Sequence, residues 1–136
     1  MEIGEGGGES FPQSVPYSIL AIDLGETTGI ASFAWGSGTV RCITTDNPAW
    51  LFPLISLLQP DEILLERFPP SPMIPYVVED AYQKLMRKAI LISPSSWKPF
   101  MKSWTRYFPQ AKTQHEKDAI SILRYYMLTT FKKDIV

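Results

Sequence analysis

Residues Ser18–Gly29 read SILAIDLGETTG, an apolar run that ends at Asp23 and is followed by a glycine-containing turn. The run is continuously apolar rather than alternating, which predicts a buried central strand over residues 17–24. Burying a carboxylate is costly unless it is paired, so Asp23 at the end of such a strand needs an explanation. Residues Glu62–Pro69, EILLERFP, repeat the design, because an apolar run leads directly into Glu66. The two stretches predict two acids brought together at one end of a sheet.

The rest of the sequence predicts a mixed α/β domain. Gly36-Ser37-Gly38 joins two strand-like runs as a hairpin, and Ser93-Pro94 marks the start of a helix. Asp46 or Asn47 is expected to cap an earlier helix, and Pro53 to distort its start. A hairpin meander followed by β-α-β units predicts a mixed sheet with helices on its faces. We expect strands at residues 17–24, 30–35, 39–45, 62–68 and 89–92, and helices at residues 47–60, 76–87, 95–108 and 113–131.

Asp23 and Glu66 are candidate metal ligands. Ligands of open α/β sheets collect at the carboxyl ends of strands, where the strand order reverses. If the first strand is central, with the second strand on one side of it and the fourth on the other, the two acids become neighbours. Two close, partly desolvated carboxylates repel each other, and a hard divalent cation such as Mg²⁺ or Mn²⁺ would relieve the repulsion. For Asp23 alone, the alternative is an aspartate that merely ends a strand in a turn.

The segment HEKDAISILRYYM, residues 115–127, adds two further candidates. His115, the sole histidine of the chain, and Asp118 lie three residues apart and so share one face of a helix. The alternative is a solvent-exposed histidine, with Asp118 favoured in the first turn by the helix dipole. Packed against the sheet, this helix would bring three carboxylates and one imidazole together. Such a set could hold two metal ions roughly 4 Å apart for attack of water on a phosphodiester.

The composition is typical of one globular domain. The chain has 136 residues, of which 45% are hydrophobic and 20% charged, and its net charge is -1. Residues 1–16 are rich in glycine and acids, so we expect a flexible tail before a domain of residues 17–136. No apolar run approaches the roughly 20 residues that span a bilayer. The single cysteine, Cys42, fits a reducing compartment and is expected to be a core residue rather than a catalytic thiol. We therefore expect a cytoplasmic protein without a membrane partner.

The charges are distributed unevenly along the chain. Residues 1–80 hold two cations against eleven acids, whereas residues 81–117 hold eight cations against one acid. In the predicted helix 95–108, three cations lie four residues apart without an acid, and a phosphate backbone would supply the missing anions. A plain solvated face is the alternative. These cations are Lys98, Lys102 and Arg106. An apolar stripe of the same helix is expected to face the core rather than stack on bases: Trp97, Phe100, Met101, Trp104 and Phe108.

Three of these features together resemble the RuvC-type Holliday junction resolvases, over residues 17–131. Asp23, after an apolar first strand and with Gly25 and Gly29 behind it, is similar to their first motif. Glu66 at the end of the fourth strand is similar to their second acid. The sequence HEKDA, beginning at His115, resembles their last motif. Each motif is short, but their order and spacing together are fairly specific, and the chain looks more like the compact phage-encoded form.

The resemblance implies a fold, a cofactor and a substrate. The fold is an RNase H-like mixed five-stranded sheet in the order 3-2-1-4-5, with strand 2 antiparallel and helices on its flanks. The activity is a Mg²⁺- or Mn²⁺-dependent endonuclease that nicks four-way DNA junctions symmetrically as a homodimer. Asp23, Glu66 and Asp118 would be ligands of two ions, with Asp23 bridging them, and His115 a ligand or a water-orienting base.

Further residues are expected to contact DNA or the partner subunit. Arg67 and Phe68 directly follow Glu66, where the family can place an aromatic that wedges into the junction. Packing of Phe68 into the core is the alternative. The helix 76–87 is the candidate dimer interface, because its apolar band is wider than one sheet face needs. Simple coverage of the sheet is the alternative for this band: Val77, Val78, Ala81, Tyr82, Leu85 and Met86.

Two other functions fit the same residues. One is an RNase H-fold nuclease that acts on RNA, of the kind implicated in ribosomal RNA maturation. The other is a nucleic-acid-binding module with a relic site. Retention of all four of the candidate residues Asp23, Glu66, His115 and Asp118 disfavours the relic.

Overall fold

The structure is a computed structural model that describes residues 18–68, 72–101 and 108–136. The predicted tail at residues 1–16 and the cations Lys102 and Arg106 lie outside these ranges. The strands are β2 (Ser18–Asp23), β3 (Thr28–Ala34), β4 (Thr39–Thr45), β5 (Glu62–Glu66) and β6 (Ile90–Ile92). The helices are α1 (Leu51–Leu58), α2 (Tyr76–Leu85), α3 (Pro94–Trp97) and α4 (Gln114–Phe131), with 3-10 turns at Pro48–Trp50 and Lys98–Met101. None of the helices in the described ranges combines the length and apolar character that crossing a membrane requires.

The five strands form one sheet in the predicted order. The observed order β4-β3-β2-β5-β6 corresponds to the prediction 3-2-1-4-5. β3 runs antiparallel to β2 and β4, whereas β5 runs parallel to both β2 and β6. β2 is therefore central, as its apolar sequence predicts. The register pairs Ile22 with Leu65, so the next residues, Asp23 and Glu66, end adjacent strands.

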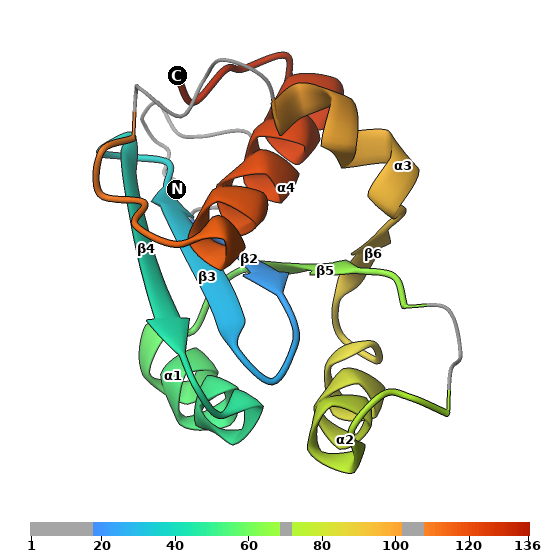
Figure 1. Cartoon of the computed structure of the whole chain (residues 1–136). Coiled ribbons are helices and arrows are strands. Elements are labelled where there is room, and N and C mark those ends of the chain that lie inside the picture. Colours follow the sequence, from blue (N-terminus) through green and yellow to red (C-terminus); the bar gives the residue numbers. More distant parts are fainter. Residues whose placement is uncertain (1–17, 69–71, 102–107) are drawn as a thin grey trace.

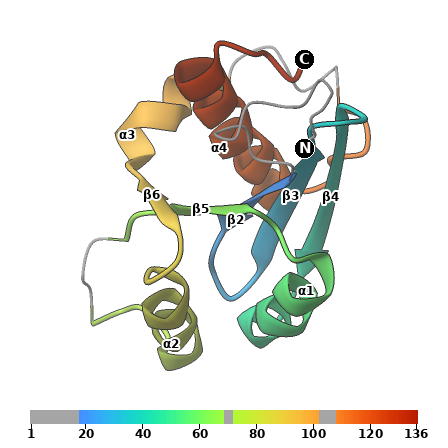
Figure 2. The same cartoon turned by 180° about the vertical axis from the view of Figure 1, so that it is seen from behind.

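Helices cover both faces of the sheet. Figures 1 and 2 show α3 and α4 on one face, and α1 and α2 on the other. Successive residues of β2 point to opposite faces, so the strand contributes to two separate core clusters. The cluster under α4 includes Ile19, Ala21, Phe33, Ile120, Leu123 and Met127. The cluster under α1 and α2 includes Leu20, Ile22, Ile30, Leu51, Val78 and Leu85.

β3 begins earlier than the sequence suggests. We expected a turn through Gly29 and a strand from Ile30, but the strand begins at Thr28. The Thr28 hydroxyl donates to the carbonyl of Gly25 at 2.7 Å and accepts from its amide at 3.3 Å. These bonds close the turn within four residues, and Gly29 is then paired with Asp23 in the sheet.

Two helices are interrupted near prolines. The side chain of Asn47 caps the turn before α1 by accepting a hydrogen bond from the Ala49 amide at 3.0 Å. That turn is 3-10 rather than α, which agrees with the distorted helix start predicted from Pro53. The predicted helix 95–108 is α-helical only to Trp97 and continues as a 3-10 turn to Met101. Pro99 has no amide hydrogen and cannot make the α-helical bond. Residues 102–107 of that predicted helix fall outside the described residues. Trp97 and Phe108, the first and last residues of its apolar stripe, are buried as expected.

The apolar band of α2 mainly covers the sheet. Val78, Ala81, Tyr82 and Leu85 are buried, and Met86 packs against the same cluster. Of the six apolar residues that suggested a dimer interface, Val77 alone is classed as exposed. The width of the band is thus explained by coverage of the sheet, which was the alternative to an interface.

The first turn of α4 is fixed by a buried carboxylate. Thr113 caps the helix by accepting from the Glu116 amide at 3.1 Å. The Glu116 side chain accepts from the Thr44 hydroxyl of β4 and from the Lys112 amide. Burial pushes the pKa of Glu116 upward, but hydrogen bonds from Thr44, Lys112, Cys42 and Thr113 outweigh it and hold the pKa below its usual range. α4 is therefore tied to the edge of the sheet at its N-terminus.

Gly29 allows that turn to lie directly against the sheet. A Cβ atom on Gly29 would lie 2.1 Å from the carbonyl oxygen of His115 and 2.8 Å from the amide nitrogen of Glu116. Real Cβ atoms do not approach backbone so closely, so any other residue at this position would push α4 away from β3.

Gly29→Ala is expected to destabilise the protein by about 3 kcal/mol, the upper end of the usual range for overpacking. The clash is with helix backbone, which cannot rotate away as a side chain can. Urea unfolding measures the loss. Gly25→Ala is the matched control, because its Cβ would meet the Thr27 backbone at 3.0 Å rather than 2.1 Å and should cost less. Equal losses for the two variants would contradict this account of α4 docking.

Candidate active site

The four predicted site residues come from three elements that meet at one end of the sheet. Asp23 and Glu66 end the neighbouring strands β2 and β5. His115 and Asp118 lie in the first turns of α4. The contact between Gly29 and the helix brings His115 to the sheet, where its Nδ1 lies 3.1 Å from Oδ2 of Asp23.

Asp118 is electrostatically coupled to both strand acids. Its negative charge contributes to raising the pKa of Asp23 and the pKa of Glu66. The charge of Glu66 also raises the pKa of Asp23. The three carboxylates therefore share one region of negative potential, as the sequence analysis expects.

Asp23 is the most perturbed of these acids. Burial raises its pKa from the ordinary 3.8 to about 6, against the opposing hydrogen bond from His115, and the two neighbouring acids add to the rise. Its side chain is 14% exposed. A carboxylate held in this way is poised to gain a cation or a proton.

Glu66 has a hydrogen-bond donor that the sequence pattern does not indicate. The indole Nε1 of Trp97 donates to Oε2 of Glu66 at 2.8 Å. Burial raises the pKa of Glu66 and Asp118 adds to the rise, whereas this hydrogen bond and the charge of Lys98 oppose it. The apolar stripe of the predicted helix 95–108 indicates that Trp97 is a core residue. The spacing of that stripe does not indicate that the indole N–H would bond to an acid.

The donor set fits a hard divalent cation, although its members are held apart. Three carboxylates and one imidazole are ligands suited to Mg²⁺ or Mn²⁺. Burial raises the pKa of Asp23 and of Glu66, and neighbouring negative charges add to the rise. Across residues 18–68, 72–101 and 108–136, however, no three histidine, cysteine or acidic side chains converge closely enough to enclose an ion. Each carboxylate is bonded to its own neighbour, with Asp118 accepting from the Gln114 side chain at 2.8 Å. Binding an ion would require these side chains to rearrange.

The predicted DNA contacts lie beside these acids where the structure describes them. Lys98 follows Trp97 and is exposed, and Arg67 is exposed after Glu66. Phe68 is partly buried, and its ring stacks on Tyr82 with the centroids 4.9 Å apart. In this structure Phe68 is therefore a packing residue, which was the alternative to a junction wedge.

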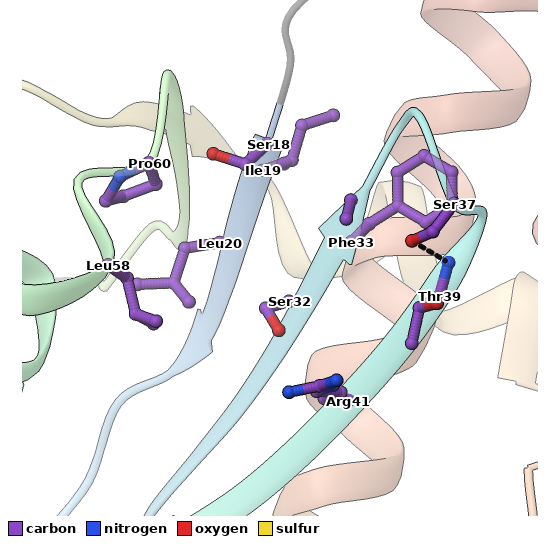
Figure 3. Close-up of a pocket in the computed structure, with 11 residues that line it drawn as sticks. Ser18, Ile19, Leu20, Ser32, Phe33, Ser37, Thr39, Arg41, Leu58 and Pro60 are labelled. Atoms are coloured by element: carbon purple, nitrogen blue, oxygen red, sulfur yellow. Dashed lines mark hydrogen bonds between the residues drawn. The ribbon is translucent and has the colours of Figure 1, made fainter.

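Other features of the surface lie away from the acids. Cys42 is half-buried against Glu116, and burial followed by the charge of Glu116 raises the thiol pKa to about 11, which fits a core residue. A hollow of about 330 Å³ lies at the opposite end of β2, where Ser18, Ser32 and Arg41 contribute to its lining (Figure 3). It contains none of the predicted site residues.

The comparisons with known proteins identify the fold. No family model matches the chain, and no curated protein matches its sequence. A structure of T. thermophilus RuvC in complex with Holliday junction substrate superimposes with a TM-score of 0.55 and 12% identity, over 83% of this chain and 96% of that one. Another Thermus thermophilus RuvC structure superimposes with a TM-score of 0.52 and 13% identity, over 82% of this chain and 96% of that one. The fowlpox virus Holliday junction resolvase superimposes with a TM-score of 0.54 and 14% identity, over 82% of this chain and 99% of that one.

At these identities the likeness is one of fold. The chain has the RNase H-like fold of the RuvC-type resolvases, a mixed five-stranded sheet flanked by helices, and the predicted fold is confirmed.

Asp23→Asn is expected to stabilise the protein in the presence of a chelator. Because the pKa of Asp23 is raised to about 6, the folded protein binds this proton more tightly than the unfolded chain. Wild-type stability should therefore fall as pH rises from about 4 to about 6 and stay lower above that range. The shift corresponds to about 3 kcal/mol at most, and partial solvation reduces the expected gain to about 1–2 kcal/mol at pH 7.5, with none at pH 4.

Urea unfolding at both pH values measures this difference. Asp80→Asn is the control, because Asp80 pairs with Lys84 on the exposed side of α2 and its loss should give no gain at pH 7.5. If the free energies of unfolding of the wild type and of Asp23→Asn change by the same amount across this pH range, the raised pKa of Asp23 is contradicted.

Proposed function

We propose that this chain is a divalent-metal-dependent endonuclease that resolves four-way DNA junctions by paired, symmetric nicks. The observation that carries the proposal is that Asp23 and Glu66 end the adjacent strands β2 and β5, with His115 bonded to Asp23 and Asp118 electrostatically coupled to both acids. The fold supports it, because its structural neighbours include RuvC with Holliday junction substrate and a viral Holliday junction resolvase.

Asp23, Glu66 and Asp118 are the proposed ligands of two Mg²⁺ or Mn²⁺ ions. Asp23 lies centrally, coupled to both other acids, and is the proposed bridging ligand. When bound, the ions would supply the positive charge that polarises the scissile phosphate.

His115 is the proposed proton acceptor. If the neutral imidazole donates from Nδ1 to Asp23, then Nε2 carries the lone pair. The side chain is 45% exposed, so Nε2 is accessible to water. As the water oxygen attacks phosphorus, Nε2 takes the proton from the water. The P–O bond to the leaving nucleotide breaks, and the leaving oxygen takes a proton from solvent. Asp23 holds the ring in the required tautomer, in the manner of an acid that orients a general base.

Arg67 and the cations of the predicted helix 95–108 are the proposed contacts with the DNA backbone. Arg67 directly follows Glu66, Lys98 directly follows Trp97, the hydrogen-bond partner of Glu66, and both cations are exposed. Lys102 and Arg106 extend the same predicted series. Their charges would offset the repulsion between phosphates and the carboxylate cluster.

Paired nicks require two active sites, and each chain offers one. A C2 homodimer matches the two-fold symmetry of a four-way junction and is the commonest assembly of identical chains. We therefore propose a homodimer that acts in the cytoplasm of a bacterial or phage-infected cell.

Asp23→Asn, Glu66→Gln and Asp118→Asn are each expected to abolish junction cleavage and to leave junction binding within about threefold of wild type. Each removes a ligand charge but leaves the basic surface unchanged. Gel-shift and cleavage assays on one synthetic junction, with Mg²⁺ or Mn²⁺, measure both quantities. Asp80→Asn should cleave normally. Near wild-type nicking by any of the three variants would refute its role as an essential ligand.

Alanine substitution of Lys98, Lys102 and Arg106 together should weaken binding to all junction sequences alike. Each lost phosphate contact reduces the magnitude of the slope of log affinity against log salt by about 0.9. The slope of the triple variant should therefore be smaller in magnitude by about three. Fluorescence anisotropy between 50 and 200 mM salt measures the slope. An unchanged slope would remove this segment from the DNA contact surface.

The active species should have about twice the 15.4 kDa mass of the chain. Multi-angle light scattering at micromolar concentration, with and without junction DNA, measures the mass. A particle that is monomeric in both conditions would contradict paired nicking and leave a nuclease that makes single cuts.

A further inference from the structure

Each carboxylate of the candidate site has one oxygen bonded to a nearby side-chain nitrogen. The pairs are Asp23 Oδ2 with His115 Nδ1 at 3.1 Å, Glu66 Oε2 with Trp97 Nε1 at 2.8 Å, and Asp118 Oδ1 with Gln114 Nε2 at 2.8 Å. His115 and Asp118 already have proposed roles in the reaction. The function proposed above does not use Trp97.

Trp97 differs from the other two partners in its burial. Its side chain is 2% exposed and belongs to the core cluster under α4, whereas His115 is 45% exposed and Gln114 lies on the exposed side of its helix. A packed indole has a single N–H and cannot rotate freely, so its position is set by the core. Trp97 is therefore the most rigid of the three partners.

The fold delivers this indole to Glu66 by a short path. Glu66 pairs with Ile92 at the end of β6, and the Arg67 amide donates to the Ile92 carbonyl at 2.8 Å. α3 begins two residues after Ile92 and carries Trp97 in its single turn. The end of β6 therefore positions both the backbone beside Glu66 and Trp97, which donates to the Glu66 side chain.

Holding one oxygen leaves the other available. Glu66 has three rotatable side-chain bonds, and ordering such a side chain costs conformational entropy. A hydrogen bond from a fixed indole supplies that order before any ligand binds. Within the described ranges, Oε2 is the Glu66 oxygen that accepts this bond, and no hydrogen bond to Oε1 is found there.

We propose that Trp97 is a positioning residue, which holds one oxygen of Glu66 through its indole N–H and presents the other oxygen to the divalent cation. The inference rests on the proposed function, because it takes Glu66 to be a ligand. Outer hydrogen bonds of this kind commonly orient metal-binding carboxylates, and their loss typically costs 10- to 100-fold in metal affinity or activity.

Mn²⁺ affinity, measured by the electron paramagnetic resonance of free Mn²⁺, tests the proposal without DNA. Trp97→Phe should raise the dissociation constant at least tenfold. Trp50→Phe is the matched control, because Trp50 is 64% exposed beside α1 and its loss should leave the affinity unchanged. Phe33→Leu controls for core damage and should leave the affinity unchanged, since Phe33 lies in the same core cluster as Trp97 but pairs with Ile19, four residues before Asp23 on β2. A Trp97→Phe protein that binds Mn²⁺ as tightly as wild type would overturn the proposal.

A spectroscopic reading separates positioning from packing. In a ¹H–¹⁵N spectrum of the metal-free protein, the Trp97 indole signal, assigned by its absence in Trp97→Phe, should move upfield in Glu66→Ala, and the Trp50 signal should stay in place. An unmoved Trp97 signal would overturn the proposal. If Trp97→Phe does not fold, 3-benzothienylalanine at position 97 keeps the ring shape and replaces the N–H with sulfur. This variant should bind Mn²⁺ at least tenfold more weakly than wild type, and equal binding would overturn the proposal.

Junction cleavage, assayed in parallel, distinguishes the two levels of inference. Weaker Mn²⁺ binding by Trp97→Phe, with no cleavage by the wild-type protein, would support the role of Trp97 and refute the proposed nuclease. Cleavage by the wild-type protein, with unchanged Mn²⁺ affinity in Trp97→Phe, would refute the role of Trp97 alone. No Mn²⁺ binding by the wild-type protein would refute both.

Discussion

The close contact between Gly29 and the first turn of α4 is the constraint on which the candidate site depends. An added Cβ at Gly29 would lie 2.1 Å from the His115 carbonyl oxygen, so only glycine allows the helix to lie on the sheet at this height. Gly29 is paired with Asp23, and the contact therefore places the imidazole of His115 against that acid. Asp118 follows within one turn of the helix, and the parallel pairing of β2 and β5 adds Glu66. One missing side chain thus permits three elements that carry the four candidate residues to lie at the same end of the sheet.

Two acids beside this contact, Glu116 and Asp23, differ in how far the protein satisfies them by hydrogen bonds. Glu116 is 6% exposed, yet four hydrogen bonds hold its pKa below the usual range, and it ties α4 to β4. Asp23 has one side-chain partner and two acidic neighbours, and its pKa is raised to about 6. The first carboxylate is satisfied by the protein itself and stabilises the fold. The second costs folding stability at neutral pH, a cost that a bound cation would remove.

The sequence predicts most of the fold and the placement of the four candidate residues at one end of the sheet, because both depend on patterns that lie along the chain. Continuous apolar runs identify the central strands, and carboxylates at their ends identify Asp23 and Glu66. Pairwise contacts between distant elements carry no such pattern. The Trp97–Glu66 hydrogen bond joins residues 31 apart, and the stripe that contains Trp97 predicts only burial. The short turn closed by Thr28, and the stacking of Phe68 on Tyr82, depend on side-chain geometry that spacing does not specify.

Cleavage of three substrates by one preparation tests the central claim most directly. A synthetic four-way junction, a linear duplex of the same sequence and a structured RNA would be incubated with Mg²⁺ or Mn²⁺, and the cut positions mapped on each labelled strand. The account predicts paired nicks at symmetric positions in two opposed strands of the junction, yielding nicked duplexes that ligase can seal, with little cutting of the other two substrates. Cutting of the RNA alone, equal cutting of the linear duplex, or junction binding without any cut would contradict it.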